Sequence, residues 1–474
     1  MRPPVGLTVD MSDVVEHFDL IIIGSGSGNH IPSDLDHLRI AIVERDVFGG
    51  TCLNKGCIPS KMFVLPADRV VEAREASSIG VDLQLNGTGW IGIRDRIFGR
   101  IDPIAASGRE YRAERCENIT LIEGTARFLH PDASGVHLID VDGRRLGAPQ
   151  ILVAAGSRPV IPPITGLVET GFHTSDGIMR LDQFPRRLGI IGGGYIAAEM
   201  GHVFSGLGAE VTLFNRSDVL LGRHDREVAE RFTAAFGQRV DLRLDHLPTR
   251  VERRGDAIAI TVGGDVIEVD ELLVATGREP NSDLLDCDVA GIEMHHHGTI
   301  VVDEYQRTSV PGIWAIGDIA NDIHLKHVAN HEADIAFWNI AHPEALRSTD
   351  HSAIPAAVFS YPQVATVGMT EQHAIDAGID YVIGRRDYAG TAYGWALADE
   401  TGFAKVIVDR TSGRIVGAHI LGPQAATLIQ PLVQAMRFGE TAERVAREVY
   451  YIHPALTEVV ENALLDAVEA MSVA

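Results

Sequence analysis

The sequence predicts an α/β protein with two tandem Rossmann-like dinucleotide-binding domains followed by a C-terminal α+β domain. A glycine-rich turn follows an apolar strand twice, at residues 24–29 and again at residues 192–197. Each unit then closes on a related segment, Leu-Val-Ala-Ala-Gly-Ser-Arg-Pro at residues 152–159 and Leu-Val-Ala-Thr-Gly-Arg-Glu-Pro at residues 273–280. Beyond about residue 350 the strands and helices come without a glycine-rich turn, which indicates a third domain of another kind.

The first glycine-rich turn has the features of a dinucleotide site. The apolar run Asp19–Ile23 predicts a buried parallel strand, and Gly24, Gly26 and Ser27 follow it. Backbone N–H groups of such a turn can hold a pyrophosphate. The next strand ends at Glu44, where a carboxylate can accept both hydroxyls of a ribose.

This turn departs from the full pattern at two positions. Asn29 stands where a third glycine is usual. Pro32 has no backbone N–H and compromises the helix expected after the turn.

Cys52 and Cys57 lie in the glycine-rich stretch Gly49–Lys61, directly after the first unit. Five residues along a regular helix separate Cα atoms by about 8.6 Å, but a disulfide needs them within roughly 7 Å. A bond between them therefore requires a distorted first turn, which Gly56 permits. Such a bond would be reducible and suits catalysis; the alternative is two unrelated buried cysteines.

Lys61 lies one helical turn beyond Cys57, on the same face. It is either an exposed surface lysine or a cation near a cofactor ring. Its position beside the cysteine pair favours the second interpretation.

The second glycine-rich turn is more complete, because Gly192, Gly194 and Ala197 fill its three small positions. Glu199, just inside the helix, could meet Lys61. The partner strand Glu210–Phe214 leads to Arg216 rather than to an acid, which favours the 2′-phosphate of NADPH over the bare ribose of NADH.

Arg223 is a candidate for a second contact to that phosphate. The alternative for both arginines is a solvated loop.

Two later segments carry further candidate groups. A strand ends in Gly317-Asp318, where the carboxylate is free to bind a polyol. Near the C-terminus, His453 precedes Pro454, which can open a helix, and Glu458 within that helix could orient the imidazole. Exposed surface is the alternative for the His/Glu pair.

Composition excludes several classes of function. The chain of 474 residues has a net charge of −24, which argues against nucleic acid and anionic membranes as partners. Its four cysteines are too few for a secreted disulfide scaffold, so we expect a reducing cytoplasm. Cys116 and Cys287 have no evident role.

No apolar run is long enough to span a membrane. The histidines His295–His297 are interpreted as an exposed turn rather than a metal site.

The N-terminal segment Met1–His17 lacks the basic and apolar regions of a signal peptide. We expect it to be a disordered extension.

These motifs together resemble those of the flavoprotein disulfide reductases, the class I pyridine nucleotide-disulfide oxidoreductases, over residues 19–465. The segments that carry the resemblance are Gly49–Lys61, Gly192–Glu199, Ala275–Arg278, Ala315–Asp318 and His453–Glu458. The resemblance implies an FAD domain formed by residues 18–157 and 278–349, an NADPH domain at 158–277 and a dimerisation domain at 350–474.

The resemblance also implies roles for individual residues. For FAD, Glu44 would hold the adenosine ribose and Asp318 the ribityl chain, and the Lys61–Glu199 pair would lie near the flavin. The other implied FAD contacts are Gly24, Gly26, Ser27, Thr51, Ala126, Gly156 and Ala329. The implied NADPH contacts are Gly192, Gly194, Tyr195, Ala197, Glu199, Arg216, Arg223 and Gly277.

For catalysis, the resemblance implies a redox disulfide between Cys52, which faces the substrate, and Cys57, which faces the flavin. His453 of the partner subunit would move protons and Glu458 would hold its tautomer, so the active site would be shared in a homodimer.

Within the family, the resemblance is greatest to the branch that reduces the disulfide of mycothiol, a cysteine-bearing pseudodisaccharide. It rests on segments such as Phe98–Ala105, Ala154–Pro163, Val302–Ser309, Leu325–Ala333 and Tyr393–Ala396. The alternatives are a dihydrolipoamide dehydrogenase, which Arg216 argues against, a glutathione-reductase-type enzyme, and a flavin-carrying redox sensor without turnover.

Overall fold

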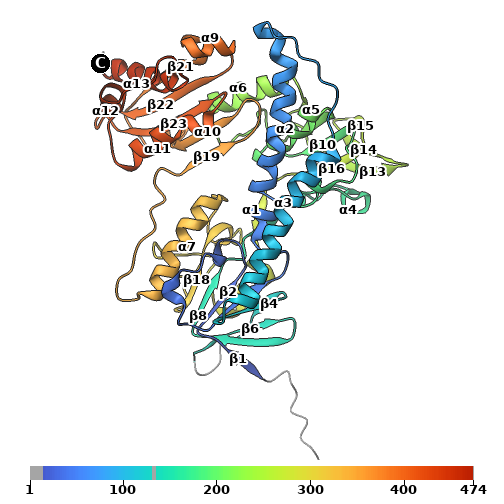
Figure 1. Ribbon diagram of the computed structural model, residues 1–474, viewed down its shortest axis with the longest axis vertical. Coiled ribbons are helices and arrows are strands. Elements are labelled where there is room, and N and C mark those ends of the chain that lie inside the picture. The colour runs from blue at the N-terminus through green and yellow to red at the C-terminus, as the bar shows by residue number, and fades with distance from the viewer. Residues whose placement is uncertain (1–13, 131–134, 473–474) are drawn as a thin grey trace, which may run out of the picture. The chain divides into compact units, whose positions relative to one another are not determined.

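A computed structural model describes residues 14–130 and 135–472 (Figure 1). The chain forms two compact units, and each unit is assembled from three separate segments. The first unit comprises Met1–Ile58, Phe98–Arg158 and Arg278–Asp350, and the second comprises Pro59–Ile97, Pro159–Gly277 and His351–Ala474. The structure therefore groups residues 59–97 with the second unit.

The first unit is built on a five-stranded parallel sheet. Its order is β18 (Ile313–Ala315), β8 (Gln150–Val153), β2 (Leu20–Ile23), β3 (Ile40–Glu44) and β4 (Ile119–Glu123). Alternate residues of β2 enter different cores: Leu20 and Ile22 share one with Phe337 of helix α7 (Lys326–Ala341), whereas Ile21 and Ile23 face the other. Burial on both faces explains why this strand is apolar throughout.

A second sheet covers one face of this five-stranded sheet. Its order is β1 (Val15–His17), β7 (Arg144–Ala148), β6 (His137–Val141) and β5 (Ala126–Phe128). The expectation of a disordered extension through His17 was wrong for β1, which pairs in parallel with β7. Glu16 stabilises this edge by pairing with Arg39 and Arg144. The rest of the expected extension, residues 1–13, lies outside the described residues.

The chain after the first glycine-rich turn does not form a long helix. Two 3₁₀ turns, Ser27–Asn29 and Ser33–Leu35, replace it on either side of Pro32. The compromised helix predicted from Pro32 is confirmed. Asn29 accepts a hydrogen bond from Arg112 at its side chain (2.8 Å) and another at its carbonyl (2.8 Å), which ties the turn to the chain after α3 (Trp90–Glu110).

The cysteine segment is a broken helix, as the spacing predicts. Helix α1 (Gly50–Asn54) carries Cys52, and two residues separate it from α2 (Cys57–Glu75). Gly56 makes the break possible, because a Cβ there would lie 3.1 Å from the carbonyl oxygen of Thr51.

The second unit contains the second dinucleotide-type sheet. Its parallel order is β12 (Asp241–Arg243), β11 (Glu210–Phe214), β10 (Arg187–Ile191) and β16 (Glu271–Val274). The unit also holds the antiparallel strands β13 (Arg250–Arg254), β14 (Ala257–Val262) and β15 (Asp265–Val269), with helices α4 (Leu167–Thr170), α5 (Tyr195–Leu207) and α6 (Arg226–Phe236). Helix α2 packs against α5, since a Cβ at Gly206 would stand 3.0 Å from the Cβ of Ala67.

The C-terminal part of the second unit is a five-stranded antiparallel sheet. Its order is β19 (Pro355–Val358), β20 (Val364–Gly368), β23 (Ile415–Leu421), β22 (Phe403–Asp409) and β21 (Tyr381–Asp387). The helices around it are α8 (Glu371–Asp376), α9 (Ala392–Leu397), α10 (Ala425–Leu428), α11 (Gln430–Arg437), α12 (Ala442–Glu448) and α13 (Thr457–Ser472).

Helix α13 lies against β21 and β22. It begins at Thr457, so Pro454 does not open it. The N–H of Glu458 bonds to the carbonyl of Ala455 (3.1 Å), three residues back, and this tight turn delays the regular helix.

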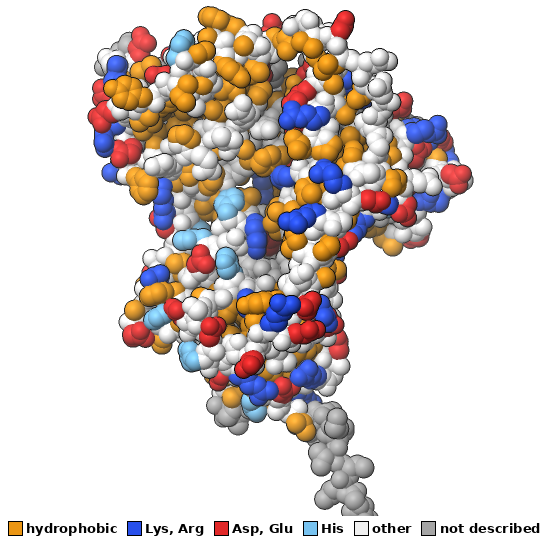
Figure 2. Space-filling view, viewed as in Figure 1, with side chains coloured by type: hydrophobic (Ala, Val, Ile, Leu, Met, Phe, Trp, Pro, Cys, Tyr) orange, Lys and Arg blue, Asp and Glu red, His pale blue; other side chains and the backbone are white. Residues whose placement is uncertain are grey.

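No helix in the described parts of the chain is both long and apolar enough to cross a membrane. Acidic and basic side chains are interspersed on the face drawn in Figure 2, without one broad basic area.

The close approach of Gly50 to the first glycine-rich turn should be sensitive to a single methyl group. A Cβ at Gly50 would lie 2.6 Å from the Cα of Gly26, and its φ is +74°. We expect Gly50→Ala to lower the free energy of unfolding by about 3 kcal/mol, from left-handed strain and overpacking together.

Gly264→Ala is the matched control. It shares a positive φ (+97°) but has open space around its Cβ position, so it should lose only about 1–2 kcal/mol. Urea denaturation measures the free energy of unfolding of both variants. Equal losses in the two would show that the close contact between Gly50 and Gly26 has no effect on stability.

Candidate redox and dinucleotide sites

Ser25 ties the first glycine-rich turn to its neighbours. Its hydroxyl donates to Glu44 (2.6 Å) and accepts from the N–H of Gly49 (2.8 Å), just before α1. The backbone N–H of Ser25 also donates to Glu44 (2.9 Å). Each carboxylate oxygen has two lone pairs, so Glu44 keeps acceptor capacity for a ribose.

A second group of candidate FAD residues meets where β8 and β18 end. The Ser157 hydroxyl donates to Asp318 (2.6 Å), and Gly317 lies so close to Ala329 that a Cβ on it would be 3.2 Å from the alanine methyl. Gly156 has open space where a Cβ would stand. The structure therefore brings Gly156, Asp318 and Ala329 to the same end of the sheet, with open space at the Cβ position of Gly156.

Ala126 lies elsewhere in the first unit. It follows Gly124, whose N–H donates to the carbonyl of Glu44 (2.9 Å), and its side chain is buried in the core. The structure thus places Ala126 toward the Glu44 end of the sheet rather than beside Asp318.

Cys52 and Cys57 are present as thiols rather than as a disulfide. Cys57 is exposed. Cys52 is half-buried and lies on α1, next to the exposed Thr51. The hydrogen bond with Cys57 and burial raise the pKa of the Cys52 thiol, whereas the charge of Lys326 opposes that rise. The pair is close enough for thiol chemistry between its members.

Lys326 is a residue that sequence reasoning missed. Its ammonium donates to the hydroxyl of Ser27 (2.9 Å), and that hydroxyl donates to the amide oxygen of Asn330 (3.1 Å). No local pattern in the sequence signals this contact, because Lys326 and Ser27 are 299 residues apart.

In the second unit, Lys61 and Glu199 form the pair that their positions suggested. The ammonium contacts both carboxylate oxygens, at 2.7 and 2.8 Å, and Glu199 is almost fully buried. The N–H of Phe359 donates to the same carboxylate (3.1 Å), and the Lys61 ammonium lies 4.9 Å from the phenyl centroid.

The second glycine-rich turn can accept a phosphate group. A Cβ at Gly192 would lie 2.2 Å from the carbonyl oxygen of Ala275, whereas Gly194, which precedes α5, has open space at its Cβ position. Ala197 is fully buried and Tyr195, the first helical residue, is exposed. An open helix N-terminus of this kind suits a pyrophosphate.

Arg216 and Arg223 both lie on the loop after β11 and are exposed. Among the residues that the structure describes, neither guanidinium has a carboxylate within 4.0 Å. Leu221 holds the loop against the turn by donating its N–H to the carbonyl of Gly193 (2.8 Å). Gly277, at the end of the unit, also has open space at its Cβ position.

His453 and Glu458 are hydrogen-bonded, with 2.7 Å between Nδ1 and Oε1. The imidazole is 73% exposed, whereas the carboxylate is only 17% exposed. Glu458 therefore fixes the ring and leaves its Nε2 side open.

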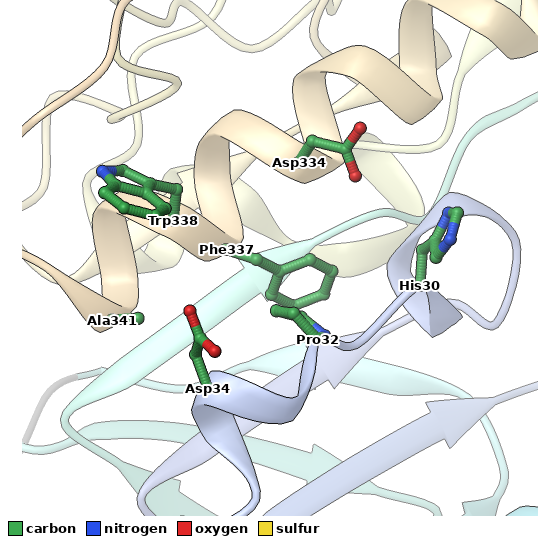
Figure 3. A pocket seen from close by; sticks show the side chains of 7 residues that line it. All are labelled: His30, Pro32, Asp34, Asp334, Phe337, Trp338 and Ala341. Carbon is green, nitrogen blue, oxygen red and sulfur yellow. The ribbon is translucent and has the colours of Figure 1, made fainter.

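A crevice and a histidine-rich turn lie apart from these sites. Figure 3 shows an open crevice in the first unit, lined by His30, Pro32, Asp34, Asp334, Phe337, Trp338 and Ala341. The turn His295–His297 is exposed, and no group of three metal-ligating side chains occurs in the described residues.

Glu332 is a second residue that the motifs did not reveal. Its carboxyl is buried on α7 and accepts from the N–H of Gly317 (2.7 Å) and from Asn321 (2.9 Å). Burial raises its pKa to about 7, and the nearby charge of Asp318 adds to that rise.

Comparison with known proteins places these sites in context. The family model described as pyridine nucleotide-disulphide oxidoreductase matches residues 18–333, and the dimerisation domain of that family matches residues 354–464. The chain is similar to mycothione reductase of Mycobacterium tuberculosis (strain H37Rv), with 47% identity over 95% of this chain and 99% of the relative.

More distant relatives share the same architecture. Glutathione reductase of Burkholderia cepacia is 34% identical over 93% of this chain and 97% of its own. Among solved structures, the HOCl-induced flavoprotein disulfide reductase RclA from Escherichia coli matches with a TM-score of 0.82, at 28% identity over 95% of this chain and 99% of that one.

The raised pKa of Glu332 predicts a pH-dependent stability. Between its ordinary pKa of 4.5 and about 7, the unfolded state loses the proton while the folded state keeps it. Folding stability from this group is therefore intact below pH 4.5 and falls as pH rises to about 7, by about 3 kcal/mol.

Glu332→Gln should be closest to the wild type in stability below pH 4.5 and become the more stable protein at pH 7.5. Urea denaturation across this range measures the difference. A difference that stays constant with pH would show that the carboxyl does not titrate as assigned.

Proposed function

The chain belongs to the pyridine nucleotide-disulphide oxidoreductase family, and on that premise we propose that it reduces mycothione to two molecules of mycothiol with electrons from NADPH. It is an NAD(P)H-dependent oxidoreductase and, like the mycothione- and glutathione-reductase types, it uses FAD and NADPH. The 47% identity to a mycothione reductase, against 34% to a glutathione reductase, carries the choice of substrate.

Each of the two glycine-rich turns is assigned to one dinucleotide. FAD is assigned to residues 18–157 and 278–349, where Glu44 and Asp318 have acceptor capacity and Gly156 leaves room. NADPH is assigned to residues 158–277, with Arg216 and Arg223 available for the 2′-phosphate. When bound, FAD supplies the hydride chemistry that links the nicotinamide to the disulfide.

The proposed work of the protein's own residues is thiol–disulfide exchange. The Cys52 thiolate attacks one sulfur of the substrate disulfide, forms a mixed disulfide and releases the first thiol. Cys57 then attacks Cys52, releases the second thiol and leaves a Cys52–Cys57 disulfide. The net reaction consumes one NADPH and one proton for each disulfide reduced.

We assign the proton transfers to His453 of the partner subunit, oriented by its Glu458. Two observations support a shared site. The segment just before the pair exposes Tyr450 completely and Ile452 by 75%, and the dimerisation-domain match spans it. Apolar side chains left so bare are typical of an interface. We place the resulting homodimer in the cytoplasm, where the four cysteines stay reduced.

Steady-state assays with different disulfides test the proposed substrate. The highest kcat/KM is expected for mycothione, against glutathione disulfide and lipoamide, and NADPH should be preferred over NADH because of the two arginines. Cys52→Ser should abolish turnover, while Cys116→Ser, outside the proposed site, should not. A preference for lipoamide, or turnover by Cys52→Ser, would refute the assignment.

A hybrid dimer tests whether the active site is shared. Cys52→Ser and His453→Gln homodimers should each be inactive or severely impaired. If each site takes Cys52 from one subunit and His453 from the other, a hybrid of the two variants has one intact site and regains roughly half of the wild-type activity. A purified hybrid as inactive as its parents would place both groups in one subunit.

A further inference from the structure

Lys326 is a half-buried cation for which the mechanism above has no role. Within the described parts of the chain, no carboxylate lies within 4.0 Å of its ammonium. Its one recorded hydrogen bond, 2.9 Å long, goes to the neutral hydroxyl of Ser27. An ammonium that loses part of its hydration without a counter-ion is destabilised, so its position favours an anion beside it during the working cycle.

The hydroxyl that holds Lys326 is itself fixed. Ser27 is buried and donates to Asn330, one turn along α7 from the lysine. The lysine thus has one of its three donors occupied and a restricted range of positions. Two donors remain for another acceptor.

The packing of α1 indicates which groups can accept hydrogen bonds from these two donors. Gly26, next to Ser27, lies against Gly50 of the helix that carries Cys52, and a Cβ on Gly50 would come within 2.6 Å of it. The charge of Lys326 interacts with both Cys52 and Cys57.

We propose that Lys326 is the counter-ion of the reduced cysteine pair, held by Ser27 and Asn330 so that one thiolate is stabilised beside it. The proposal rests on the redox role assigned to Cys52 and Cys57. Lys326 acts as a positioning residue, because it takes no part in bond making.

The effect follows from the charge balance of the couple. Two electrons and one proton convert the disulfide to one thiol and one thiolate, so the reduced form gains a negative charge. A fixed cation favours that form over the neutral disulfide. Lys326 therefore raises the reduction potential of the pair and increases the thiolate fraction available for attack.

The test uses the FAD-loaded enzyme and two variants: Lys326→Met, which removes the positive charge, and Lys326→Arg, which keeps it. The dithiol–disulfide equilibrium is measured against mixtures of reduced and oxidised dithiothreitol, and cysteine alkylation is mapped by mass spectrometry. For Lys326→Met we expect the equilibrium to shift about tenfold toward the disulfide, about 30 mV. Alkylation by iodoacetamide at pH 6 should slow by about threefold, and Lys326→Arg should restore both values.

Lys55→Met is the matched control. Lys55 lies between the two cysteines in sequence, but its ammonium pairs with Asp46, so its loss should leave both measurements unchanged. Circular dichroism and retained FAD establish that each variant is folded.

Three results would overturn this inference separately from the proposed function. An unchanged equilibrium in Lys326→Met, a shift of the same size in Lys55→Met, or loss of FAD without any shift would show that Lys326 does not serve the thiols. Absence of any Cys52–Cys57 disulfide in the oxidised wild type would instead refute the proposed function itself.

Discussion

The contact between Gly26 and Gly50 joins the dinucleotide turn to the cysteine helix. Neither residue has a side chain, so the backbone of α1 rests directly on the turn. Ser25 reinforces the contact by bonding to both Glu44 and the N–H of Gly49. A redox pair must lie at a fixed distance from the groups that act on it, and this contact sets the position of Cys52 relative to the turn.

The side chains of Lys61, His453 and Lys326 are held by different kinds of partner. Lys61 is neutralised by the buried carboxylate of Glu199. His453 is oriented by Glu458 and remains exposed. Lys326 is held by neutral partners, so its charge remains available to an anion.

Local patterns in the sequence were sufficient to predict the strand–turn–strand units, the broken helix between Cys52 and Cys57, and the shortened helix at Pro32. Each depends on nearby residues, such as Gly56, where a Cβ would make a tight contact with the Thr51 carbonyl oxygen at 3.1 Å. Lys326 and Glu332 could not be predicted in this way, because their surroundings come from Ser27 and Gly317, on other segments. The strand Val15–His17 was missed for the same reason, since its partner β7 lies far along the chain.

Cysteine mapping after anaerobic addition of NADPH shows whether electrons from NADPH reach the Cys52–Cys57 pair. The oxidised holoenzyme is treated with NADPH without a disulfide substrate, alkylated and digested. If electrons take this route, Cys52 and Cys57 become alkylated only after NADPH addition, while the buried Cys287 stays unmodified throughout. Alkylation of both cysteines before NADPH is added, or of neither afterwards, would contradict it.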